Sequence, residues 1–182
     1  MLKDIGVYDA FLPEPDSYRR FALQQTFRSF EFEHCTFHGI APLSLSEFVP
    51  TAIGKLLAPS VSTLSFLRRS PLGQEEPHFI HTDIDMGDWS AILYLNENPP
   101  EGDGTTFWTH KPTGAIESLV PHERSEEGRS PQGWGARKTV QARFNRLLIF
   151  PSSYFHSRAI FDNWGRGDDA RLTQVTFGRW AA

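Results

Sequence analysis

The sequence has one cysteine, no long apolar run and no excess of positive charge. A single cysteine, Cys35, excludes an internal disulfide and a four-cysteine zinc site. No apolar run approaches the roughly 18 residues that a transmembrane helix needs. The N-terminal stretch is broken by acids and prolines, unlike a signal peptide. The net charge of −4 argues against non-specific nucleic-acid binding. We therefore expect a soluble, cytoplasmic protein without membrane contact, and the sequence does not indicate its oligomeric state.

Aromatic residues, in contrast, are plentiful. The chain of 182 residues contains fifteen Phe and five Trp. A chain of this length can bury most of its apolar surface in one core. The sequence therefore predicts a single domain over residues 1–182.

The first third of the chain shows helical periodicity in two places. Apolar residues recur at helical spacing after a Pro-Asp-Ser start, which predicts a helix over residues 16–25. A second helix is predicted over residues 50–58, with a proline near its first turn. Residues 1–60 are thus expected to form a helical support.

From about residue 61 the chain reads as strands. Short runs rich in β-branched and aromatic residues alternate with Pro, Gly, Asn and Asp at intervals of about ten residues, which is typical of an antiparallel sandwich or barrel. Residues 112–137 are richer in charged residues, Gly and Pro, and predict an insertion between strands. The predicted strands of this eight-strand sandwich are 61–70, 76–84, 88–97, 104–111, 138–144, 145–152, 154–161 and 170–180.

A histidine and an aspartate stand two residues apart in HFIHTDID. Alternation along a strand puts His81 and Asp83 on one face, where both can reach a common point. Mixed nitrogen and oxygen ligands with open positions are typical of non-haem Fe(II) sites. His156, which opens a later predicted strand, is the candidate third ligand. Asp85 and Asp88 are alternatives to Asp83.

A second polar group is predicted on the last strand. Arg171 and Thr173 share a face of ARLTQVTFGRW. A guanidinium binds a carboxylate through two parallel hydrogen bonds, and a nearby hydroxyl adds a third donor. The pair therefore indicates an anchor for a carboxylate.

The order His-x-Asp, distal His and then Arg resembles the Fe(II)- and 2-oxoglutarate-dependent oxygenases, in particular their prolyl-4-hydroxylase-like branch. The likeness covers about residues 61–180 and includes SAILYLNE and EGDGTTFWTH. The arrangement also looks like that of a small, largely uncharacterised bacterial group. The resemblance implies a double-stranded β-helix, the cupin-like jelly roll, with the N-terminal helices packed on one sheet.

The resemblance also implies chemistry and cofactors. His81, Asp83 and His156 would hold Fe(II), while Arg171, Thr173 and Tyr94 would bind the cosubstrate 2-oxoglutarate. O2 would be consumed, succinate and CO2 released, and ascorbate would stimulate turnover. An amino acid, a peptidyl residue or a small metabolite would be hydroxylated. The carboxylate ligand favours hydroxylation over halogenation, because halogenases of this superfamily have a small residue there.

Three alternatives stay open at this stage. The interval between His156 and Arg171 is longer than in most members of the branch, so Arg166 or Arg158 is an alternative anchor. A cupin-like metal dioxygenase that uses no 2-oxoglutarate is a second reading. A jelly-roll module that binds carbohydrate through Trp134 and Trp164 is the third.

Overall fold

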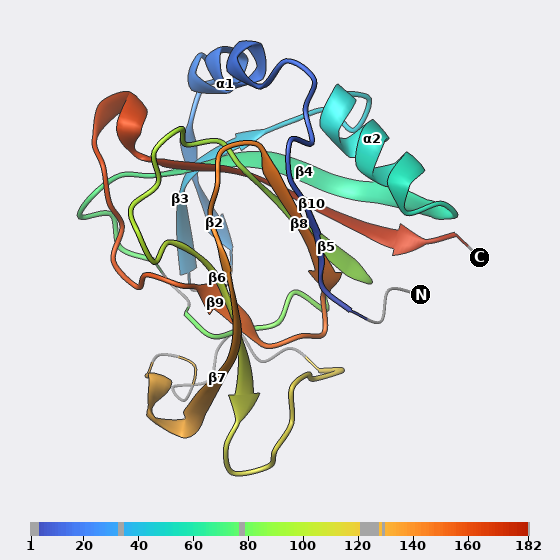
Figure 1. Ribbon diagram of the computed structural model, residues 1–182, viewed down its shortest axis with the longest axis vertical. Helices are drawn as coiled ribbons and strands as arrows, with labels where there is room; N and C mark the ends of the chain where they lie inside the picture. Colours follow the sequence, from blue (N-terminus) through green and yellow to red (C-terminus); the bar gives the residue numbers. More distant parts are fainter. Residues whose placement is uncertain (1–3, 33–34, 77–78, 121–127, 129, 182) are drawn as a thin grey trace.

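The computed structural model describes residues 4–32, 35–76, 79–120, 128 and 130–181. Within these ranges the chain forms two α-helices, ten strands and two short 3-10 helices (Figure 1). The helices are α1 (Pro15–Leu23) and α2 (Phe48–Leu56), and the 3-10 helices are η2 (Pro131–Gly133) and η3 (Gly167–Asp169). The strands are β1 (Gly6–Tyr8), β2 (Arg28–Phe32), β3 (Cys35–Pro42), β4 (Ser60–Ser70), β5 (Trp89–Tyr94), β6 (Gly104–His110), β7 (Trp134–Gln141), β8 (Arg146–Pro151), β9 (His156–Arg158) and β10 (Arg171–Trp180).

The strands form two antiparallel sheets. The larger sheet has the order β1-β8-β5-β10-β4-β3-β2, and the smaller one has the order β7-β6-β9. An isolated bridge between His81 and His156 adds the segment around His81 beside β9. This arrangement of two facing sheets, with connections that cross between them, is a jelly roll. The predicted fold is confirmed.

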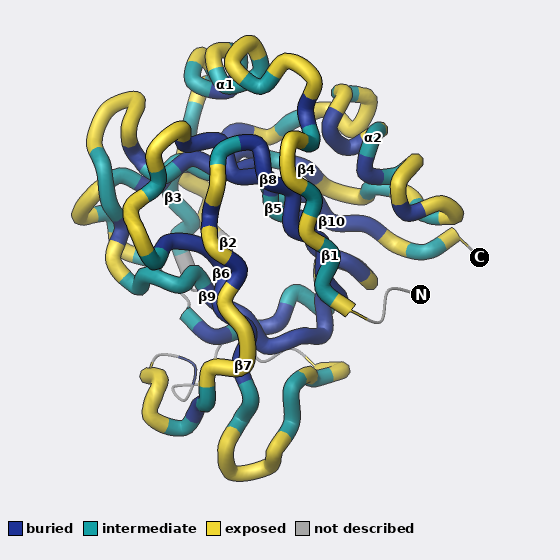
Figure 2. The backbone as a smooth tube through the Cα atoms, viewed as in Figure 1, coloured by how far each residue is buried: buried dark blue, intermediate teal, exposed yellow. Residues whose placement is uncertain are grey.

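Both faces of the central strands are buried, so these strands read as nearly continuous apolar runs (Figure 2). On β5 and β8, one set of alternating residues packs against the helices and the other set faces the smaller sheet. The helix-facing set is Trp89, Ala91, Leu93, Leu147 and Ile149. The inner set that packs with Phe107 and Val140 of the smaller sheet includes Tyr94, Leu148 and Phe150.

The two helices cover the outer face of the larger sheet. Ala22 of α1 and Val49 and Ile53 of α2 are fully buried in the cluster that includes Leu67 of β4. Tyr18 of α1 also reaches the sheet through a hydrogen bond. The helices therefore stabilise the sheet from outside and leave its inner face free for other side chains.

The N-terminal third holds more than helices. Strands β1, β2 and β3 were not expected there, and they extend the larger sheet at both edges. Edge strands are short or mixed in polarity, because one of their sides faces solvent. Periodicity is weak in such segments, and this is why the sequence predicted only eight strands.

The segment before the central strand β5 also differs from the prediction. Residues 76–84 were expected to form a strand, but His81 is the only residue of 79–84 in a bridge, and a turn follows at residue 84. Pro77 and His78 lie outside the described residues.

The predicted insertion at 112–137 is shorter at its C-terminal end, because β7 already begins at Trp134. Among the described residues, no helix is long and apolar enough to cross a membrane.

Candidate metal centre

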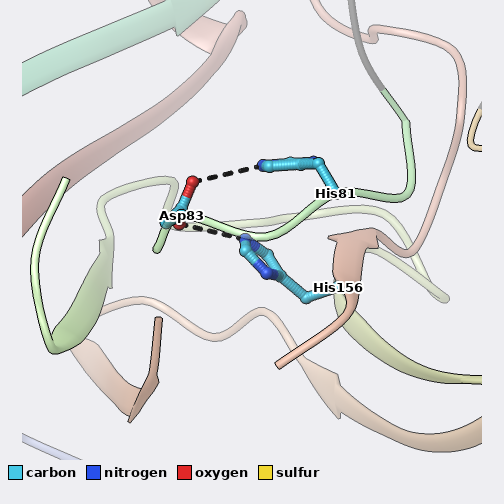
Figure 3. Close-up of side chains that lie close together, drawn as sticks. All are labelled: His81, Asp83 and His156. Carbon is cyan, nitrogen blue, oxygen red and sulfur yellow. Dashed lines mark ion pairs between the residues drawn. The ribbon is translucent and has the colours of Figure 1, made fainter. Parts of the chain in front are cut away.

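Three side chains from two distant segments converge between the sheets (Figure 3). His81 Nε2 lies 3.5 Å from Asp83 Oδ1, and His156 Nε2 lies 3.2 Å from Asp83 Oδ2. One ligand atom from each residue falls within 4.8 Å of the others. His156 is buried, whereas the side chains of His81 and Asp83 are 25% and 15% exposed. Solvent therefore reaches the site at His81 and Asp83 and not at His156.

The backbone fixes the orientation of both imidazole rings. His81 Nδ1 lies 2.8 Å from the carbonyl oxygen of Phe79, and His156 Nδ1 lies 3.0 Å from that of Tyr154. A carbonyl only accepts, so each Nδ1 carries the proton and donates it. This hydrogen bond selects the tautomer in which Nε2 offers a lone pair, as metal-binding histidines require.

Two Nε2 lone pairs and two carboxylate oxygens then face one another. Acceptors at such distances repel unless a cation, either protons or a metal ion, lies among them. Burial alone would raise the pKa of Asp83, but the hydrogen bonds and charges of His156 and His81, when these are protonated, outweigh burial and hold that pKa well below its usual range. Two imidazoles and one carboxylate with open positions fit Fe(II) by the chemistry of their donor atoms.

Neighbouring side chains support the ligands. Ser90 of β5 donates a hydrogen bond to Asp83 Oδ2 at 3.1 Å, and its hydroxyl lies 2.8 Å from that of Ser152. The ring of His156 packs against Phe150 at a centroid distance of 4.6 Å. Ser90 thus positions Asp83 by a hydrogen bond, and Phe150 positions His156 by ring packing. Ser90 was not predicted, because a serine inside a strand carries no signal of a role.

Farther along the inner face lies the predicted carboxylate anchor. Thr173 of β10 is paired with Tyr94 of β5, and both are buried. The Tyr94 hydroxyl lies 2.7 Å from that of Thr105 on the smaller sheet. Burial raises the pKa of Tyr94 to about 12, so its phenol stays protonated at neutral pH and can donate. Arg171 opens β10 on the same face, and its Nε donates to Asp103 at 3.1 Å.

The structure also locates the alternative residues. Arg166 is exposed at the N-cap of η3, away from the inner face. Asp85 is exposed, and Asp88 accepts a hydrogen bond from the backbone of Trp180. Trp134 is 2% exposed and packs edge-to-face against Phe155, so its ring is not open to a sugar in solution.

Two further charged residues that sequence reasoning had not singled out lie near the anchor. Arg68 of β4 stands opposite Thr173, and Glu76 forms ion pairs with both Arg68 and Arg158. A charged residue in a strand that contains five Ser and Thr residues gives no signal of a buried role. The strand that pairs with β4 could not be deduced from the sequence either.

The chain is similar in structure to several proteins whose structures have been solved. It matches the alpha-ketoglutarate-dependent carbocyclase SnoK from nogalamycin biosynthesis with a TM-score of 0.59 and 13% identity, over 96% of this chain and 78% of that one. It matches iron-bound HygX from Streptomyces hygroscopicus with a TM-score of 0.53 and 16% identity, over 96% and 81%. It matches a prolyl hydroxylase from Trichoplax adhaerens with a TM-score of 0.55 and 13% identity, over 96% and 82%.

At these identities the likeness shows the fold, which is the jelly roll of the 2-oxoglutarate-dependent enzymes. The chain belongs to a family of unknown function, DUF6445, whose sequence profile matches residues 55–177. No curated protein matches the sequence. The matched range runs from within α2 to β10 and includes all three residues of the candidate metal centre.

Proposed function

We propose that the protein is a non-haem Fe(II)- and 2-oxoglutarate-dependent oxygenase of the prolyl-4-hydroxylase-like branch. The observation that carries this proposal is the convergence of His81, Asp83 and His156, with both Nδ1 protons directed to backbone carbonyls. Arg171, on the inner face of the same jelly roll, supports the use of 2-oxoglutarate as cosubstrate. The order of these three residues and the arginine along the chain supports assignment to the prolyl-4-hydroxylase-like branch.

The residues of the chain have separate roles in this proposal. His81, Asp83 and His156 bind the iron and leave open positions for 2-oxoglutarate and O2. Arg171 and Thr173 bind the distal carboxylate of 2-oxoglutarate, and Tyr94 donates from its protonated phenol. When bound, Fe(II) supplies the activation of O2 that couples release of succinate and CO2 to substrate oxidation.

The class of substrate is also proposed. The similar structures include an enzyme of nogalamycin biosynthesis and a prolyl hydroxylase in complex with a peptide fragment. These neighbours support a small metabolite, an amino acid or a peptidyl residue as substrate. The carboxylate ligand Asp83 supports hydroxylation as the outcome.

The test is an anaerobic titration of the protein with Fe(II) and then with 2-oxoglutarate. We expect the weak visible charge-transfer band of the iron chelate. His81→Ala removes a ligand and abolishes the band through loss of metal, whereas Arg171→Ala retains metal and loses the band through weak cosubstrate binding. His38→Ala is the matched control, since His38 bonds to Ser29 far from the centre, and it leaves the band unchanged.

Other outcomes of this titration point elsewhere. Metal binding without a band in the unmodified protein contradicts the use of 2-oxoglutarate and supports a cupin-like metal enzyme. Binding of neither metal nor 2-oxoglutarate contradicts the oxygenase and supports a binding module.

A further inference from the structure

Arg68 lies on the same inner face as the proposed carboxylate anchor. The pairing of β4 with β10 sets Arg68 opposite Thr173 and Ser70 opposite Arg171. Arg68 and Arg171 are therefore diagonal neighbours on adjacent strands, a spacing that long side chains span. Two guanidinium groups in such positions repel each other unless an anion lies between them.

The guanidinium groups in this region outnumber the carboxylates. Glu76 is shared, because its Oε2 contacts Arg68 and its Oε1 lies 3.1 Å from Arg158 Nη2. Arg171 is paired with Asp103. Among the described residues, these three arginines form ion pairs with only two carboxylates, so Arg68 and Arg158 share one counter-ion in a largely buried place. An uncompensated buried charge is costly, so an anionic ligand would stabilise this group.

Arg68 has more free donors than Arg158 within the described part of the chain. Arg158 uses both Nη atoms, which donate to Asn163 and Glu76. Arg68 donates only through Nη2, to Glu76, within the described part of the chain. Its side chain keeps 21% exposure, so a ligand from solvent can reach it. Burial lowers the pKa of Arg68, and the charge of Arg171 adds to this, whereas the charges of Glu76 and Asp83 oppose it.

Arg171 has free donors as well. Its Nε binds Asp103, while its two Nη atoms have no hydrogen-bond partner among the described residues. Asp103 is buried, with 2% exposure, and it fixes the guanidinium through Nε while both Nη atoms stay available. A carboxylate that arrives at this place can accept from Arg171 and from Arg68 at the same time.

We propose that Arg68 is a second anchor for the distal carboxylate of 2-oxoglutarate, which it shares with Arg171. This inference rests on the proposed function. Glu76 holds Arg68 in place through Nη2, and the remaining donors face the ligand. Because two guanidinium groups serve one carboxylate, the site selects a 2-oxo dicarboxylate over a 2-oxo acid with an uncharged end.

The experiment pairs a variant with a truncated ligand. The Fe(II)-loaded protein is titrated anaerobically with 2-oxoglutarate and with 2-oxopentanoate, which has a methyl group in place of the distal carboxylate. Arg68→Gln keeps a donor for Glu76 and removes the charge. We expect it to weaken 2-oxoglutarate binding roughly 10- to 100-fold, as for loss of a hydrogen bond to a charged group. Binding of 2-oxopentanoate stays unchanged.

Arg69→Gln is the matched control. Arg69 is the next residue of β4, and its guanidinium donates instead to the carbonyl oxygen of Gly167. This variant should keep the preference of the unmodified protein for 2-oxoglutarate over 2-oxopentanoate. Fe(II) affinity, measured in the same titrations, reports whether each variant retains the folded centre.

Two results overturn the inference while the proposed function stands. One is an unchanged preference for 2-oxoglutarate in Arg68→Gln; the other is an equal loss for both ligands, which indicates a structural role. If Arg68→Gln fails to bind Fe(II), Arg68→Lys decides, since it keeps the charge but loses the fork. A reduced preference in Arg68→Lys supports the anchor, and an unchanged one overturns it. If the unmodified protein gives no charge-transfer band with either ligand, both the proposed function and this inference are wrong.

Discussion

At the scale of single residues, the ligands owe their orientation to their neighbours. Each histidine is held by a backbone carbonyl, and Asp83 is held by the hydroxyl of Ser90. Without that hydroxyl, Asp83 Oδ2 would lose the hydrogen bond that fixes it to β5. Residues in contact with ligands commonly change metal affinity by about 10- to 100-fold when they are replaced.

We therefore expect Ser90→Ala to weaken Fe(II) binding by about tenfold or more without unfolding the protein. Anaerobic calorimetric titration measures this affinity. Ser62→Ala serves as the control, because Ser62 donates instead to the backbone of Pro50, on the helix side. Equal affinities in Ser90→Ala and Ser62→Ala would contradict a role for Ser90 in orienting Asp83.

At the scale of elements, β10 is the strand on which the larger sheet depends. It pairs with β5 on one side and β4 on the other, and its register shifts against β4 between Phe177 and Gly178. A Cβ atom at Gly178 would lie 2.0 Å from Trp89 Cζ2 and 2.4 Å from the carbonyl oxygen of Val61. The indole of Trp89 is fully buried, so it has no room to move aside.

Gly178→Ala should consequently lower the free energy of unfolding by about 1–3 kcal/mol, the usual cost of overpacking a core. Urea denaturation measures the change. Gly133→Ala is the control, since a Cβ atom there meets nothing within 4 Å, and we expect it to leave stability unchanged. A stable Gly178→Ala variant would mean that Trp89 can repack.

At the scale of the whole molecule, one carboxylate ties the two sheets together. Glu76 pairs with Arg68 of the larger sheet and Arg158 of the smaller one. Burial raises the pKa of Glu76, but the charges of Arg68 and Arg158 outweigh this and lower it below 4.5. Because the pKa is lowered in the folded state, the Glu76 carboxylate stabilises the fold above pH 4.5. This stabilisation is lost as the pH falls through the lowered pKa.

Glu76→Gln should therefore be less stable than the unmodified protein at neutral pH, by about 3 kcal/mol for two buried guanidiniums that lose their counter-ion. The difference should shrink steadily as the pH is lowered below 4.5. Thermal unfolding of both proteins across this range checks the prediction. A difference that is independent of pH would show that Glu76 contributes through packing and not through its charge.

The same three scales explain what the sequence could predict. The runs SAILYL and RLLIF are buried on both faces, and their short apolar character between turn residues predicts strands. The His81 and Asp83 pair was visible because two ligand types stood at a fixed spacing. Ser90 and Arg68 were not, because their roles depend on which strands become neighbours. Register between distant strands is set by tertiary packing, and a single sequence does not display it.

His81 and His156 are joined by more than a shared point in space. The backbone N–H of each donates to the carbonyl of the other, at 3.0 and 2.9 Å. These two hydrogen bonds hold together segments that are far apart in the chain, so part of the entropy of loop closure is lost before a metal ion arrives. The second imidazole therefore meets the ion at a high effective concentration. By reciprocity, a bound ion would resist separation of the two segments, so metal retention and integrity of the fold would rise and fall together.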